Sequence, residues 1–97
     1  TVGGALSQNA AFWGSGRSGS AADAALGFEI ALASGELLCT GVLARRGAAG
    51  EPVARHFGPD LTALFVGDCG RFGVKLRIAL AVQPVPAAHG SVSFSFE

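Results

Sequence analysis

The clearest pattern in the chain is the segment Val74-Lys75-Leu76-Arg77-Ile78-Ala79-Leu80-Ala81-Val82-Gln83, in which large apolar residues occupy every second position. A period of two residues is typical of a strand with one buried face. At about 3.3 Å per residue, this strand would be about 30 Å long and would cross a whole sheet. We therefore predict that Leu76, Ile78 and Leu80 are buried and that Lys75 and Arg77 face solvent.

Two further strands are predicted upstream of this segment. Leu26–Ala33 alternates in the same way, and Glu36–Gly41 follows it after Ser34-Gly35, which is typical of a two-residue hairpin turn. All three strands are expected to share one antiparallel sheet. Strict alternation fixes the register, because a slip of one residue would expose the whole apolar set, so Phe28 and Ile30 are expected in the core.

Short helices are expected around the sheet. One lies within the first eleven residues, a single turn lies near Ala21–Ala25, and a third runs from Asp60 to Phe65, because Asp is a favourable N-cap. Residues 41–56 show no periodicity and are expected to form a surface excursion. Ser91–Phe96 alternates again and is predicted to be a fourth strand. The predicted fold class is therefore α+β, an antiparallel sheet with short flanking helices.

Composition and charge exclude several classes of protein. Seven basic and seven acidic residues give a formal net charge of zero, which argues against a nucleic-acid partner, because such proteins need a basic face. No apolar run approaches the roughly 20 residues of a transmembrane segment. The two cysteines and two histidines have no metal-site spacing, so no metal is expected, and two cysteines cannot form a disulfide framework.

Glycine is abundant, with 15 residues in 97, and three clusters stand out. Gly3-Gly4 precedes a short helix and Gly67–Gly73 precedes the long strand. Each cluster can be a plain loop, or a place where backbone approaches a large anionic or planar ligand. Gly14–Gly19 matches G-x-G-x-x-G, but no buried strand precedes it, so we do not interpret it as a Rossmann fingerprint.

Spaced blocks of residues in one order resemble the FAD-linked oxidase superfamily, the vanillyl-alcohol oxidase and p-cresol methylhydroxylase type. This superfamily includes D-lactate dehydrogenases, the flavin subunit of glycolate oxidase and alkylglycerone-phosphate synthase. The resemblance covers residues 1–86. The blocks that carry it are Thr1-Val2-Gly3-Gly4, Asn9-Ala10, Gly16-Arg17-Ser18-Gly19 with Asp23, Leu26-Gly27-Phe28-Glu29-Ile30, Leu37, Thr40-Gly41, Gly58 to Gly67, Gly70 and Gly73-Val74.

The resemblance implies a domain organisation. In this superfamily two α+β subdomains enclose the flavin, and the chain resembles the second of them over residues 1–86. Residues 87–97 would then be the connection to a substrate-binding cap and its first strand. The expected partners are an upstream FAD subdomain and that cap, both of the same enzyme, together with a small-molecule substrate.

The resemblance also implies a cofactor, FAD, and the residues that bind it. These expected FAD-binding residues are Gly3, Gly4, Gln8, Asn9 and Ala10 along the pyrophosphate and ribityl chain, Ser18 and Gly19 near the flavin, and Asp68, Gly70, Gly73 and Val74 along the adenosine half. No residue of the chain is expected to be catalytic; an acid or base would lie in the cap.

The function implied is the FAD-binding portion of a flavin-dependent oxidoreductase that oxidises a 2-hydroxy acid or a related alcohol. Two alternatives stay open: an enzyme like alkylglycerone-phosphate synthase, in which FAD performs no net oxidation, and a non-catalytic α+β binding module whose glycine clusters are turns. A cytoplasmic location is expected, with attachment to a membrane surface as the alternative.

Overall fold

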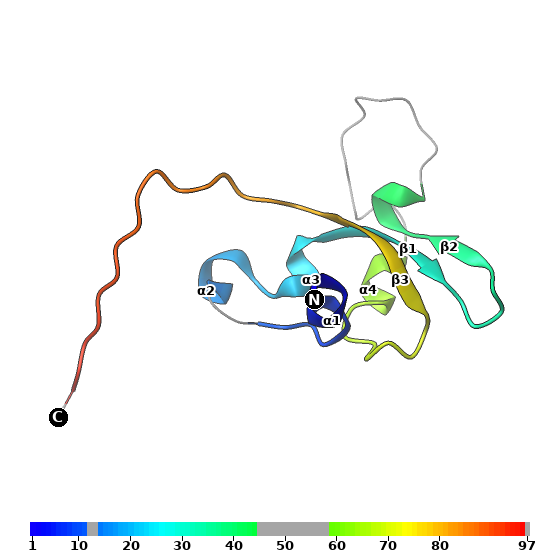
Figure 1. The fold of residues 1–97 in the computed structure, drawn as a ribbon, viewed down its shortest axis with the longest axis horizontal. Helices are drawn as coiled ribbons and strands as arrows, with labels where there is room; N and C mark the ends of the chain where they lie inside the picture. Colours follow the sequence, from blue (N-terminus) through cyan, green and yellow to red (C-terminus); the bar gives the residue numbers. More distant parts are fainter. Residues whose placement is uncertain (12–13, 45–58, 97) are drawn as a thin grey trace.

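The computed structural model describes residues 1–11, 14–44 and 59–96 (Figure 1). Over these ranges the chain has an α+β fold, in which short helices accompany a three-stranded antiparallel sheet, so the predicted class is confirmed. The predicted surface excursion over residues 41–56 lies mostly outside the described residues. The elements are α1 (Val2–Ser7), α2 (Ser15–Ser18), α3 (Ala21–Ala24), β1 (Ala25–Ala31), β2 (Leu37–Cys39), η1 (Gly41–Leu43, a 3₁₀ turn), α4 (Leu61–Leu64) and β3 (Val74–Leu80).

The sheet has the order β2-β1-β3, and β1 pairs antiparallel with both neighbours. The prediction that these three segments share one sheet is confirmed. The predicted two-residue turn between β1 and β2 is wrong. Leu32 donates its N–H to the carbonyl of Glu36 at 2.9 Å, which closes a loop of three residues. The last of these, Gly35, has φ of +85°, as such a loop requires.

An irregularity in β3 changes which side chains face the core. Phe28 pairs with Ile78, and Ile30 pairs with Lys75, so β1 advances by two residues while β3 advances by three. Leu76 is therefore the extra residue of a β-bulge, and Lys75 faces the same side as Ile78. The predicted burial of Leu76 is wrong, since this residue is 53% exposed. The predicted exposure of Lys75 is also wrong, since its side chain is only 4% exposed.

A second irregularity affects β1 at Leu26. Ala25 pairs with Leu80 and Gly27 pairs with Ala79, so here β1 carries the extra residue. This bulge places Ala25 on the same face as Phe28, three positions later. Both side chains are fully buried. With the remaining core residues, Leu6, Ile30 and Phe65, they form one cluster against which Ile78 and Leu80 pack at the margin.

The turn after β2 crosses β1 closely. A Cβ atom on Gly27 would lie 2.5 Å from the carbonyl oxygen of Thr40, so only glycine fits there. Thr40 itself is buried and continues the sheet: its N–H donates to the Phe28 carbonyl at 2.8 Å, and its hydroxyl accepts from the Phe28 N–H at 3.0 Å. The hydroxyl of Thr62 donates to the same Thr40 oxygen at 3.1 Å, which attaches α4 to the sheet.

Helix α4 begins as the sequence predicts. The side chain of Asp60 accepts a hydrogen bond from the Ala63 N–H at 3.1 Å, so Asp60 is the N-cap. The cap satisfies one of the N–H groups that a helix start leaves without a partner.

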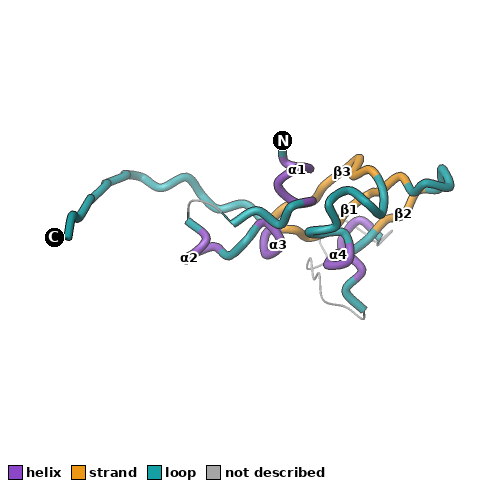
Figure 2. Tube along the Cα trace, turned by 90° about the horizontal axis from the view of Figure 1, so that it is seen from below, coloured by secondary structure: helices purple, strands orange, loops and turns teal. Residues whose placement is uncertain are grey.

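Residues 81–96 leave the sheet as an extended segment that carries no strand, so the predicted fourth strand over Ser91–Phe96 is wrong. In both views this segment runs past α2, away from the hairpin of β1 and β2 (Figures 1 and 2). Its start is held by a hydrogen bond from the Gln83 amide to the Ser18 hydroxyl at 2.9 Å. Farther along, Val92 and Phe94 are 78% exposed and Phe96 is 92% exposed, so no core stabilises pairing there.

The crossing at Gly27 yields a stability prediction. Gly27→Ala should lower the free energy of unfolding by about 1–3 kcal/mol, because the added methyl group overpacks the contact with Thr40. The matched control is Gly16→Ala in α2, where a Cβ meets no atom within 4 Å; it should leave stability unchanged or raise it by up to about 1 kcal/mol. Urea denaturation measures both values, and equal stability of the two variants would contradict this packing.

Candidate functional site

Two glycine clusters that lie far apart in the sequence line one open cavity of about 290 Å³. Gly3 and Ser7 of α1 form one side. The other side comes from the loop after α4 and the first residues of β3, which supply Gly70, Gly73, Val74 and Lys75. Four of the residues expected to bind FAD therefore lie together, namely Gly3, Gly70, Gly73 and Val74.

Backbone hydrogen bonds hold the two sides of the cavity together. The N–H of Gly67 donates to the Leu6 carbonyl, and the N–H of Cys69 donates to the Ser7 carbonyl, both at 2.9 Å. The end of α1 and the loop after α4 thus satisfy each other's backbone groups. The ring of Phe72 also packs edge-on against the buried ring of Phe65, with centroids 6.2 Å apart. These contacts fix the position of the loop relative to α1.

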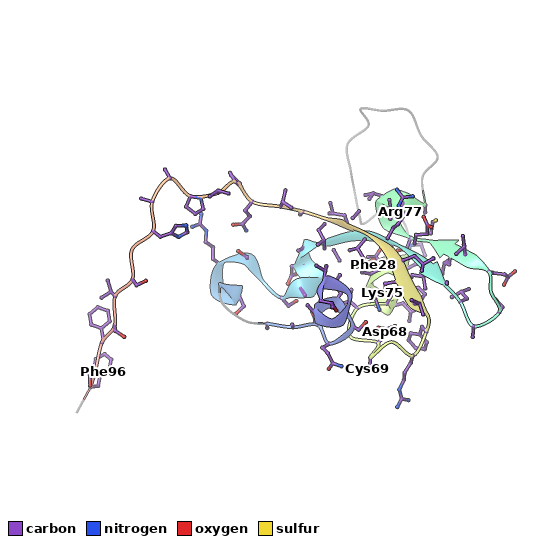
Figure 3. The ribbon with its side chains drawn as sticks, viewed as in Figure 1. Phe28, Asp68, Cys69, Lys75, Arg77 and Phe96 are labelled. Atoms are coloured by element: carbon purple, nitrogen blue, oxygen red, sulfur yellow. The ribbon has the colours of Figure 1, made fainter. Side chains whose placement is uncertain are left out.

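The polar centre beside the cavity is a buried ion pair between Lys75 and Asp68 (Figure 3). The ammonium Nζ of Lys75 lies 2.7 Å from Oδ1 of Asp68, and it also donates to the hydroxyl of Ser7 at 2.9 Å. The Phe28 ring centroid is 5.9 Å from the same ammonium, within cation–π range. Side-chain exposure is 4% for Lys75 and 0% for Asp68.

The carboxylate of Asp68 is held in its charged form. Burial opposes the charge and raises the pKa of Asp68. The hydrogen bond from Lys75, the N–H of Gly70 at 3.1 Å, the positive charge of Lys75 and the backbone N–H of Phe72 together outweigh burial, so the pKa lies below its ordinary value. Asp68 does not line the cavity itself, whereas its partner Lys75 does.

The glycines around the cavity are not equivalent. A Cβ on Gly3 or Gly70 would meet no atom within 4 Å, although Gly70 has φ of +72° and would strain any other residue. A Cβ on Gly73 would lie 2.6 Å from both Ile30 Cγ2 and the Ala31 carbonyl oxygen. Gly73 is therefore required by sheet packing, whereas Gly3 is free of any packing constraint.

Gly4, one of the residues expected to bind FAD, has a backbone N–H that already has a partner. The N–H of Gly4 donates to the Thr1 hydroxyl at 3.1 Å, so Thr1 acts as the N-cap of α1. The next N–H, that of Ala5, donates to the Thr1 carbonyl at 3.0 Å. Only Val2 and Gly3 keep N–H groups without a partner inside this helix.

Gln8, Asn9 and Ala10 lie in the turn that follows α1 and do not line the cavity. The side-chain oxygen of Asn9, which has φ of +47°, accepts from the Ala22 N–H at 3.0 Å and so connects this turn to α3. The carbonyl of Ala10 accepts from the Ala21 N–H at 2.9 Å. Asn9 and Ala10 thus have structural contacts that place α3.

Ser18 and Gly19 lie at the end of α2, apart from the cavity. The Ser18 hydroxyl accepts the hydrogen bond from Gln83 at the start of the extended segment. Gly19 has φ of +75°, and a Cβ there would collide with the carboxyl group of Asp23. The same carboxyl caps α3 through the Ser20 N–H at 2.7 Å, so Gly19 makes room for a helix cap.

Ser7 and Lys75 line the cavity but were not expected there from the sequence. Ser7 gives no sequence signal beyond its nearness to Gly3-Gly4. Lys75 gives a misleading one, because the period-two pattern assigns it to the solvent face. Only the register of β3 against β1, with its bulge at Leu76, moves Lys75 to the core side.

Comparison with protein families found no family model that matches the chain. A search of curated proteins found no match either. Within the described part of the chain, no three His, Cys, Asp or Glu side chains are grouped so as to hold a metal ion. No helix over the same residues has the length and apolar character needed to cross a membrane.

The ion pair predicts a dependence of stability on acid. Because the pKa of Asp68 is lowered by folding, its stabilisation is present above the unfolded value of about 3.9 and is lost as pH falls through the lower folded value. Asp68→Asn leaves the Lys75 ammonium buried without a counter-charge. This variant should lose about 3 kcal/mol of unfolding free energy at pH 7, and its difference from wild type should shrink below about pH 4.

The control for this prediction is Glu29→Gln. Glu29 pairs with Arg77 at 3.1 Å on the opposite face of the sheet, where the Arg77 side chain is 69% exposed. The loss there should be at most about 1 kcal/mol. Urea denaturation between pH 3 and 7 measures both differences. A difference for Asp68→Asn that stays constant over this range would contradict the assignment.

Proposed function

We propose that the chain is the FAD-binding portion of a flavin-dependent oxidoreductase that oxidises a 2-hydroxy acid or a related alcohol. The observation that carries the proposal is the shared cavity, since Gly3 and the pair Gly70 and Gly73 lie far apart in the sequence and line the same space. Separate loops can serve one long cofactor only if they open onto one cleft. The resemblance to FAD-linked oxidases supports the identity of the cofactor.

The residues present fit part of an FAD molecule. Gly3 and Gly70 carry no side chain that would fill the cavity, and the N–H groups of Val2 and Gly3 are donors without a helical partner. Lys75, whose ammonium is bonded to Asp68 and Ser7, is among the residues that line the same space. Backbone N–H groups and a cation are suited to phosphate oxygens. When bound, FAD would supply the hydride chemistry.

The size of the cavity supports a partial site. At about 290 Å³, it is at the lower limit of ligand pockets, and a dinucleotide needs more enclosure. We therefore infer that the remainder of the cofactor contacts an upstream subdomain of the same enzyme, and that a substrate cap supplies the catalytic acid or base. Both cysteines are free, which agrees with the cytoplasmic location that we propose.

Gly3→Leu tests the proposal in the complete protein. The new side chain would enter the cavity without meeting any atom within 4 Å at its Cβ, so FAD occupancy should fall at least about tenfold while stability is kept or rises by up to about 1 kcal/mol. The measurements are the ratio of flavin to protein absorbance and the thermal denaturation of cofactor-stripped protein.

The matched control is Gly16→Leu, since Gly16 is also helical and open but does not line the cavity. It should keep full flavin occupancy. Gly73→Val, in contrast, should unfold the protein through its clash with Ile30 and is unsuitable as a test of cofactor binding. Full occupancy in Gly3→Leu, or a protein that takes up no FAD at all, would overturn the proposal.

A further inference from the structure

Packing of the sheet does not require a buried lysine at position 75. Without the bulge, the apolar side chain of Leu76 would face the core beside Ile78, as the alternation predicts. Instead Leu76 is 53% exposed, and an ammonium group occupies the inner side. A buried ion pair adds little net stability relative to apolar packing. Departures of this kind from local rules concentrate at functional sites.

The ammonium of Lys75 retains binding capacity. It has three N–H donors, and the described residues accept from two of them, through Asp68 and Ser7. Lys75 also lines the cavity with Gly3 and Gly70. A charged donor that two partners hold in place, on a residue that borders an open cavity, is suited to an oxyanion.

We propose that Lys75 is the residue that recognises a phosphoryl group of the nucleotide in this cavity, with Asp68 and Ser7 as the groups that position its ammonium. The proposal rests on the proposed function for the presence of a nucleotide and adds a residue that the resemblance does not supply. Asp68 has two opposing effects: it holds the ammonium at the cavity, and its negative charge reduces the attraction for an anion.

This charge arrangement predicts two variants that change the affinity for a phosphoryl ligand in opposite directions. Asp68→Asn keeps the shape of the side chain and removes the competing charge, so it should tighten binding of inorganic pyrophosphate and of ADP by about tenfold. The double variant Asp68→Asn with Lys75→Met removes the cation as well, without leaving a buried unpaired charge. It should weaken binding of both ligands by about tenfold relative to wild type. If the ion pair were purely structural, the affinity for both ligands would change in the same direction in the two variants.

The measurement is isothermal titration calorimetry of the full protein, stripped of cofactor, with pyrophosphate and with ADP at two salt concentrations. Thermal denaturation of each variant fixes the temperature at which it is folded. The control is the double variant Glu29→Gln with Arg77→Met, which removes an ion pair from the other face of the sheet and should leave both affinities unchanged. A larger salt dependence is expected for Asp68→Asn, because a free cation binds the anion.

Each outcome decides the proposal. Tighter binding in Asp68→Asn with weaker binding in the double variant supports it. Affinities that change in the same direction, that stay within twofold, or that are undetectable for both ligands in wild type overturn it. Flavin occupancy is measured separately: a protein that takes up FAD with equal affinity in all variants keeps the proposed function and loses the role of Lys75. A third result is a protein that takes up no FAD but whose affinity for pyrophosphate and ADP rises in Asp68→Asn and falls in the double variant. That result supports Lys75 as a phosphoryl-binding residue and overturns the flavin proposal.

Discussion

The extra residue at Leu76 sets the side of the sheet on which the ammonium of Lys75 lies, and the cavity depends on that placement. Once Lys75 faces inward, it meets Asp68 from the loop after α4 and Ser7 from α1. One side chain therefore connects three segments that the backbone hydrogen bonds of Gly67 and Cys69 already bring close. In the low-dielectric surroundings of Phe28, breaking this pair would leave a buried charge, so the three segments are held as a unit.

Four glycines among the described residues fall into two groups according to their surroundings. Gly27 and Gly73 are surrounded by backbone and side chains of the sheet, and a methyl group there would collide. Gly3 and Gly70 border open space; the positive φ of Gly70 already requires glycine there, whereas neither packing nor backbone conformation requires it at Gly3. Richness in glycine alone does not distinguish these cases; the surroundings of each position do. Gly3 is therefore the position whose glycine a bound molecule would explain.

Much of the fold could be predicted from the sequence, and the site only in outline. The three strands of the sheet are where the sequence indicated, although the alternation over Ser91–Phe96 forms no strand. Asp60 caps α4 as its residue type suggested. The glycine clusters that meet at the cavity were also visible. The faces of β3 could not be predicted, because a bulge depends on how β3 pairs with β1. The alternation within β3 alone gives no sign of it. For the same reason Lys75 was missed, and the contact of Asn9 with α3 depends on tertiary placement that no spacing encodes.

The exposed segment at residues 91–96 has a consequence for the behaviour of the protein in concentrated solution. Its sequence, Ser-Val-Ser-Phe-Ser-Phe, has no charge, proline or glycine, and its three apolar side chains point to one side of an extended chain. Short uncharged segments with this composition stack with identical copies into tightly interdigitated sheets. We therefore expect self-association to begin at these six residues rather than at the sheet, and a charge at Ser93 or Ser95 would act as a gatekeeper against it.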